Sequence, residues 1–136
     1  MSHPPLHHPQ RYPRMQLRLW LAPGLWLGPG KADLLELIGR TGSISEAGRQ
    51  MGMSYKRAWS LVTGMNAMFA QPLVLSERGG AGGGGATLTA TGTEVLARFR
   101  RIEAEAAQAT AEDIAKLQAL QTTPAADAPP DDTATD

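Results

Sequence analysis

Two helix-start signals lie close together in the middle of the chain, with a glycine between them. Ser43 stands three residues before Glu46, the spacing of a capping box, which predicts a short helix that runs to about Met51. Gly52 follows, and glycine can adopt the positive φ that ends a helix without steric cost. Ser54 can then cap a longer helix. The pattern therefore predicts two helices joined by a tight turn.

The longer helix, Ser54 to Phe69, has two unlike faces. Apolar residues recur along it at spacings of three and four, which predicts a face that packs on the domain: Ala58, Leu61, Val62, Met65, Met68 and Phe69. The opposite face is small, polar and basic: Lys56, Arg57, Ser60, Thr63, Gly64 and Ala67. Tyr55 and Trp59 flank the apolar face, and we expect both at the edge of the core, with Trp59 mainly in packing.

A short helix, a turn containing glycine and a longer helix describe a helix-turn-helix, whose second helix lies in the major groove of DNA. The outer face of such a helix must be slim enough for a groove about 12 Å wide, and the small residues above meet that demand. Lys56 and Arg57 oppose the helix dipole in the first turn, a position explained if phosphates or guanine edges complete the site. An ordinary helical hairpin has the same pattern, so both interpretations stay open at this point.

The charges are divided unevenly along the chain. The whole sequence has 13 basic and 13 acidic side chains. Residues 1–101 have 12 basic and 5 acidic side chains, a net of +7, whereas residues 102–136 have 1 basic and 8 acidic, a net of −7. A basic body with an acidic tail indicates a polyanionic partner for the body.

Further elements are expected on both sides of the helix pair. Alternating residues predict a strand over Met15–Leu21 that ends at Pro23-Gly24. Helical spacing then predicts a helix closed by Thr41-Gly42: Leu34, Leu35, Leu37 and Ile38. After Phe69, two short strands, Leu73–Glu77 and Ala86–Leu88, are joined by a glycine-rich segment.

A last helix is expected from Thr89 onward, with Thr91 and Glu94 at the spacing of another capping box. An apolar stripe follows at spacings of four and three, close to a heptad seam: Val95, Phe99, Ile102, Ala106 and Ala109. The stripe shifts by one residue at Ile114, Leu117 and Leu120, which predicts a stutter or a helix restart near Thr110.

The glycine-rich segment allows two functional interpretations. Gly80, Gly82 and Gly85 fit a dinucleotide-binding spacing, but a strand follows them where that motif needs a helix. We therefore favour a flexible hairpin whose backbone can approach phosphates, with Arg78 as the charge at its base. A loop without function is the alternative.

Several classes of function are not expected. The chain has no Cys, and its three His, at positions 3, 7 and 8, lie in a Pro-rich leader, so we expect no metal site, no cofactor and no enzyme. No apolar run approaches the roughly 20 residues that cross a bilayer, and no signal peptide is present, so we expect a soluble, cytoplasmic protein.

Four segments together resemble the N-terminal domain of ModE-type molybdate-responsive transcription regulators, a winged helix-turn-helix similar to that of LysR-type regulators. The resemblance covers about Leu17 to Ile102 and rests on Thr41-Gly42-Ser43-Ile44-Ser45-Glu46-Ala47, Met53-Ser54-Tyr55-Lys56-Arg57-Ala58-Trp59, Met65-Asn66 and Gly82-Gly83-Gly84-Gly85-Ala86-Thr87-Leu88-Thr89. It implies a mainly α-helical fold with a small β-hairpin wing and a long C-terminal dimerisation helix. The expected organisation is a disordered leader 1–14, a DNA-binding domain 15–88, a dimerisation helix 89–120 and a disordered acidic tail 121–136.

The resemblance also implies roles for individual residues. The residues that would face DNA are Ser54, Tyr55, Lys56, Arg57 and Ser60, with Ser43 and Ser45 near phosphates. The wing would contact the DNA backbone through Arg78, Gly82, Gly83 and Gly84, and the dimer seam would contain Val95, Phe99 and Ile102. The family often has an acidic residue at the position of Ser60, a Glu-Arg pair where Leu75-Ser76 stand, and a basic residue where Ala81 stands.

The expected function is therefore a homodimeric transcription regulator that binds double-stranded DNA. Family members that sense molybdate carry C-terminal oxyanion-binding domains, and we expect no such domain after Leu120, hence no small-molecule effector bound by this chain. One alternative is a protein-interaction module of the same fold that pairs with another regulator without binding DNA. Another is an oxyanion-binding or nucleotide-using enzyme built on the glycine loop.

Overall fold

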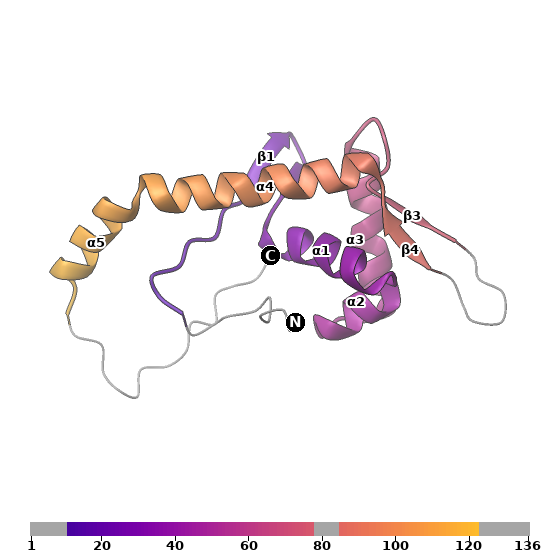
Figure 1. The fold of residues 1–136 in the computed structure, drawn as a ribbon, viewed down its shortest axis with the longest axis horizontal. Helices are drawn as coiled ribbons and strands as arrows, with labels where there is room; N and C mark the ends of the chain where they lie inside the picture. The colour runs from indigo at the N-terminus through magenta and orange to yellow at the C-terminus, as the bar shows by residue number, and fades with distance from the viewer. Residues whose placement is uncertain (1–10, 78–84, 123–136) are drawn as a thin grey trace.

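The computed structural model describes residues 11–77 and 85–122. Its elements follow in the order β1 (Leu19–Ala22), β2 (Leu25–Leu27), α1 (Pro29–Thr41), α2 (Ile44–Gln50), α3 (Tyr55–Met68), β3 (Val74–Ser76), β4 (Ala86–Leu88), α4 (Ala90–Ala109) and α5 (Ala111–Leu120). Figure 1 shows α1, α2 and α3 packed at one end, with the β3–β4 hairpin beside them, while α4 passes over this group and continues away from it into α5. The fold is the mainly helical one, with a small antiparallel hairpin, that the sequence predicts.

The core lies between the three N-terminal helices and the β3–β4 hairpin. Its fully buried large side chains come from α1, from α3 and from the residue before β3: Leu34, Leu35, Ile38, Met65 and Leu73. A smaller cluster of Leu27, Ala32 and Phe99 joins β2, α1 and α4. The two clusters place α3 and α4 in fixed positions relative to α1.

The turn between α2 and α3 has the local structure that the sequence predicts. The Ser43 hydroxyl accepts a hydrogen bond from the Glu46 N–H (3.0 Å), and the Ser54 hydroxyl accepts one from the Arg57 N–H (3.1 Å). Gly52 has φ +74°, a conformation that side chains rarely adopt. A Cβ at Gly48 would lie 2.9 Å from the Cβ of Ala58, so the two helices approach closely because residue 48 has no side chain.

The N-terminal strand forms a hairpin that the sequence interpretation missed. Instead of Met15–Leu21, the strand is Leu19–Ala22, and it pairs antiparallel with β2, Trp20 opposite Trp26. The chain turns at Gly24, where φ is +76°, and β2 has only three residues before α1 begins. The residues before Leu19 therefore lie beyond the reach of β2. Lys31 of α1 lies 3.6 Å from the Trp26 ring centroid and donates to the Trp26 carbonyl, which holds the hairpin on α1.

Asn66 joins the C-terminal end of α3 to the β3–β4 hairpin. Its Oδ1 accepts from the N–H groups of Leu73 (2.8 Å) and Val74 (3.0 Å), and its Nδ2 donates to the Val74 carbonyl (3.0 Å). Leu73 and Val74 are both buried, so water cannot readily replace Asn66 as the hydrogen-bond partner of their backbone groups. The side chain of one residue thus sets where β3 starts.

Asn66→Ala is therefore expected to lower the free energy of unfolding by about 2–3 kcal/mol, because it leaves buried N–H groups of residues 73 and 74 without their acceptor. Asn66→Asp keeps an acceptor for these N–H groups but sets a carboxylate oxygen against the Val74 carbonyl, so it is expected to be destabilised as well. Urea unfolding followed by circular dichroism measures both changes. An alanine variant as stable as the wild type would contradict this role.

The start of α4 differs from the capping box expected at Thr91 and Glu94. Thr89 is the N-cap: its hydroxyl accepts from the Gly92 N–H (2.9 Å) and donates to the Pro72 carbonyl (2.6 Å). Glu94 instead pairs with Arg98 on the helix surface. Thr89 is preferred because one hydroxyl caps the helix and also fixes the strand connection.

At its C-terminal end, α4 stops at Ala109 and α5 begins at Ala111, which confirms the predicted restart near Thr110.

A charged cluster fastens α4 to α1. Arg100 donates to Asp33 Oδ1 (2.7 Å), to Glu36 Oε1 (3.0 Å) and to Glu103 Oε1 (3.0 Å). Burial alone would lower the pKa of Arg100, but the hydrogen bonds and charges of Asp33 and Glu103 outweigh it and raise that pKa. The guanidinium stays charged, and the pairing fixes the angle at which α4 leaves the domain.

Candidate nucleic-acid interface

One face of α3 is buried and the other is free, as its periodicity predicts. Ala58, Val62 and Met65 are buried against the domain. The exposed residues form the free face of α3: Tyr55, Lys56, Arg57, Trp59, Ser60, Thr63, Gly64 and Ala67. No residue of α3 is acidic, so the free face has only positive charge. Its N-terminal turn lies at the end of α3 away from α4 (Figure 1).

The two aromatic residues of the free face are more exposed than the apolar pattern predicts. That pattern predicts Tyr55 and Trp59 at the edge of the core, whereas the family resemblance implies that Tyr55 faces DNA, and their side chains are 56% and 43% exposed. Their rings stack on each other, with centroids 6.3 Å apart and planes at 22°. Residues four apart share one side of a helix, which lets the two rings meet there instead of against the core. Helix α3 therefore presents an exposed aromatic pair within its first two turns, the part of the helix that also holds Lys56 and Arg57.

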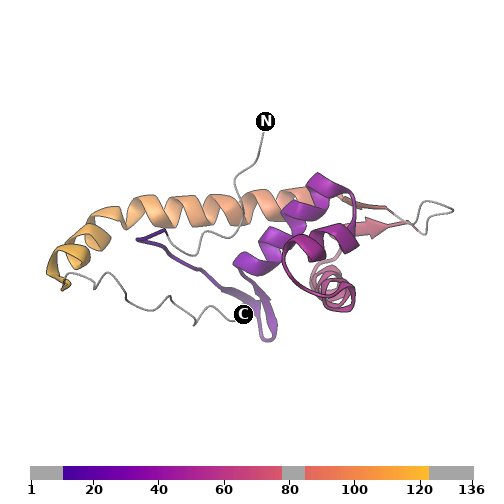
Figure 2. The same cartoon turned by 90° about the horizontal axis from the view of Figure 1, so that it is seen from below.

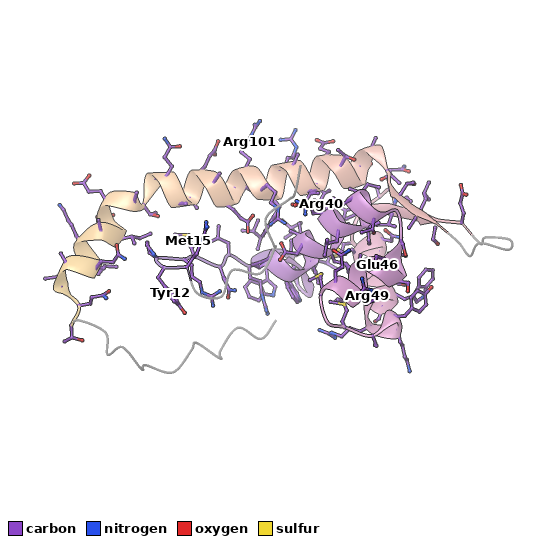
Figure 3. The ribbon with its side chains drawn as sticks, turned by 60° about the horizontal axis from the view of Figure 1, so that its bottom comes forward. Tyr12, Met15, Arg40, Glu46, Arg49 and Arg101 are labelled. Carbon is purple, nitrogen blue, oxygen red and sulfur yellow. The ribbon has the colours of Figure 1, made fainter. Side chains whose placement is uncertain are left out.

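Helix α2 contributes polar residues next to the turn. Ser45 is exposed, whereas Ser43 is half-buried and its hydroxyl is engaged as the cap of α2. Arg49, which the sequence interpretation did not single out, is exposed and pairs with Glu46 across one helical turn (Figure 3). The hydrogen bond from Arg49 lowers the pKa of Glu46 and raises that of Arg49. The sequence signal for this ion pair is an acidic and a basic residue three apart on one helix.

The predicted wing residues Arg78, Gly82, Gly83 and Gly84 lie outside the described residues. The strands on either side are described: β3 and β4 pair antiparallel, and the Glu77 N–H donates to the Gly85 carbonyl (2.8 Å). Leu75, Ser76 and Glu77 are exposed. The hairpin thus extends from the core beside α3, as seen in Figure 2.

The three predicted dimer residues differ in their surroundings. Phe99 is 2% exposed and packs against Leu27 and Ala32 of its own chain, so its side chain already has partners. Val95 is half-buried against the same cluster. Ile102 is 40% exposed and lies beyond the packed part of α4. On the outer side of α4, Arg101 projects away from α1 (Figure 3). Ile102 is therefore the member of the three with the most surface left for a partner.

The described residues offer little for a site of another kind. Within residues 11–77 and 85–122, no three His, Cys, Asp or Glu side chains are grouped so as to hold a metal ion. No helix in that part of the chain has the length and apolar character needed to span a bilayer. A groove of about 160 Å³ lies far from the free face of α3, between residues 13–15 and the junction of α4 and α5, and its lining is mostly apolar.

Comparison with known proteins gives several relatives. The chain is 47% identical over 85 residues to the molybdenum-pterin-binding protein MopB of Rhodobacter capsulatus, which covers 62% of this chain and 32% of MopB. It is 40% identical over 82 residues to the molybdenum transport protein ModE of Azotobacter vinelandii, or 60% of this chain and 30% of the relative. It is 40% identical over 80 residues to the DNA-binding transcriptional dual regulator ModE of Escherichia coli K12, or 59% and 30%.

No protein-family model matches the chain. The chain spans about a third of the length of the curated relatives that it matches. Over a wider set that includes MopA of Rhodobacter capsulatus and ModE of Haemophilus influenzae, the identity lies between 33% and 47%, over about 60% of the chain. The sequence is therefore similar, over some three-fifths of its length, to part of ModE, MopA and MopB proteins, several of which are named as transcriptional regulators.

Proposed function

We propose that this chain binds double-stranded DNA as a homodimer and regulates transcription, with α3 in the major groove. The observation that carries the proposal is the free face of α3. Lys56 and Arg57 are exposed in its first turn, and the side chains that follow, Ser60, Thr63 and Gly64, are small enough for close approach to base edges. The similarity to proteins named as transcriptional regulators supports the same function.

The polar residues around α3 complete the proposed interface. Ser43, Ser45 and Ser54 lie at the N-terminal ends of α2 and α3, where backbone N–H groups and hydroxyls commonly contact phosphates. Arg49 adds an exposed guanidinium on α2, which is paired with Glu46. We further propose that the wing, with Arg78, Gly82, Gly83 and Gly84, contacts the DNA backbone. These contacts would position the protein, while Arg57 and Ser60 would contact base edges.

A titration against short random-sequence duplexes tests the proposal directly. Fluorescence anisotropy at low salt should detect binding that weakens steeply as salt rises, because each neutralised phosphate releases counterions. The logarithm of affinity should fall with the logarithm of salt concentration by about 0.9 for each phosphate contacted. A chain that binds no duplex at low salt would contradict the function.

A dimer that pairs along α4 makes its own prediction. Ile102→Asp is expected to raise the dissociation constant of the dimer at least about tenfold, because a carboxylate would be placed in an apolar contact. Ala97→Asp is the matched control, since the exposed residue 97 lies about 140° away around the helix. Sedimentation equilibrium measures both constants. A wild-type chain that stays monomeric at micromolar concentration would argue against the dimer.

A second candidate is a protein-interaction module that binds another regulator and no DNA. The observation in its favour is the exposure of Leu117 and Leu120 on α5, where apolar side chains have few neighbours. The titration with random duplex separates the two functions. The positive free face of α3 favours DNA, and we retain DNA binding as the proposal.

A further inference from the structure

We propose that the stacked pair of Tyr55 and Trp59 recognises thymine methyl groups in the major groove and so contributes to sequence preference. The inference rests on the proposed function, because it assigns a ligand group to two residues of the same helix face. It goes beyond that function in naming a chemical group that α3 would recognise. It also gives Trp59, expected at the edge of the core and mainly in packing, a role in binding.

The aromatic pair is exposed on the same two turns of α3 that hold its cations. Large apolar side chains that are grouped, exposed and bordered by polar residues commonly mark a binding surface. Tyr55 and Trp59 stack on each other and not against the core, and Lys56 and Arg57 lie between them in sequence. With no acidic residue on α3, the face is complementary to a polyanion that also presents apolar groups.

The chemistry of the major groove decides which group such a pair can contact. Among the groups that base pairs present there, the C5 methyl of thymine is the apolar one, and apolar side chains contact it in known complexes. All other groups on these edges are hydrogen-bond donors or acceptors. An exposed aromatic ring that enters the groove therefore has thymine methyl groups as its matching partners.

The separation of the two aromatic residues along α3 is comparable to that of neighbouring base pairs. Residues 55 and 59 are four apart, so their Cα atoms are separated by about 6 Å along the helix. Successive bases of one strand are about 3.4 Å apart along the DNA axis, and a helix that follows the major groove lies oblique to that axis. The pair can therefore reach about one or two neighbouring base pairs. Ser60 and Thr63 continue the exposed face with small side chains, so the helix can lie close enough for ring and methyl to touch.

The experiment uses the full chain and duplexes selected from a random pool for tight binding. Each thymine of the selected duplex is replaced singly by uracil, which removes only the methyl group. Loss of one buried methyl should weaken binding roughly three- to fivefold at one or two positions. In Tyr55→Ala and Trp59→Ala, the same uracil replacements should have no further effect. Tyr55→Phe should keep the penalty, because it keeps the ring.

Matched measurements keep this test separate from that of the proposed function. Trp20→Ala removes an exposed tryptophan from β1 and should leave the uracil penalties unchanged. Thermal unfolding confirms that the variants fold, as expected for exposed residues. Selected duplexes that bind equally well with thymine and uracil throughout would overturn the inference while leaving DNA binding intact. Failure to select any duplex would instead count against the proposed function.

Discussion

Gly92→Ala is expected to lower the free energy of unfolding by about 3 kcal/mol or more, which is a large fraction of the stability of a domain this size. A Cβ at residue 92 would lie 2.1 Å from the carbonyl oxygen of Leu73 and 2.9 Å from its carbonyl carbon. Both are backbone atoms of a fully buried residue, so no side chain can rotate to make room. The start of α4 would have to move away from β3, and with it the Thr89 cap.

Gly64→Ala is the matched control for this prediction. It makes the same chemical change inside a helix, but a Cβ at residue 64 would meet nothing within 4 Å. Because alanine has the higher helix propensity, this variant should gain about 0.5–1 kcal/mol. Chemical denaturation of both variants gives the comparison. If Gly92→Ala were as stable as Gly64→Ala, the close contact between α4 and Leu73 would be refuted.

The double variant Lys56→Glu, Arg57→Glu is expected to lose duplex affinity at least about a hundredfold at about 0.1 M salt. Two attractive interactions with phosphate or base edges would become repulsive, and the salt slope should fall by about 2. The variant should be at least as stable as the wild type, because acidic residues in the first turn favour the helix dipole and Lys56 and Arg57 oppose it. Loss of binding with retained stability would thus locate the interface.

Equal changes of net charge elsewhere provide the comparison. Arg101 and Lys116 are exposed residues of α4 and α5, outside the free face of α3, and residue 101 lies about 100° around α4 from Ile102. Replacing both residues with glutamate should lower the affinity for the duplex only a few-fold, because it weakens only the long-range electrostatic attraction of the whole protein. Anisotropy titrations on one duplex compare the two double variants. Similar losses in both would mean that the total charge, and not α3, governs binding.

Local signals account for most of the fold that the sequence predicts. The caps at Ser43 and Ser54 and the breaks at Gly42 and Gly52 act over three or four residues, so their outcome depends on neighbours that the sequence places beside them. The Thr89 cap was missed because its advantage comes from the Pro72 carbonyl, seventeen residues away. The Asn66 bridge and the Arg100 cluster depend on still more tertiary structure.

The periodicity of α3 predicts the residues in the middle of the candidate interface, but not those where the two faces of the helix meet. Buried and exposed residues in the middle of each face of α3 follow the 3.6-residue repeat. Trp59 lies where the two faces meet, and its exposure depends on how far neighbouring elements extend. Phe99 fits the heptad spacing of a dimer seam, but the same spacing suits packing on α1 and β2. Periodicity indicates which side of a helix is apolar, not which partner covers it.

The fastening of α4 by Arg100 has a consequence for the architecture of a DNA site. In a dimer that pairs along α4, the rigid angle between α4 and the core would fix the distance and the rotation between the two α3 helices. Half-sites for such a pair would be separated by about one helical repeat of DNA, or a multiple of it. One inserted base pair would turn the second half-site by about 35°, beyond what a clamped helix could follow. The spacing of the two half-sites would then depend on the ion pairs of Arg100 with Asp33, Glu36 and Glu103.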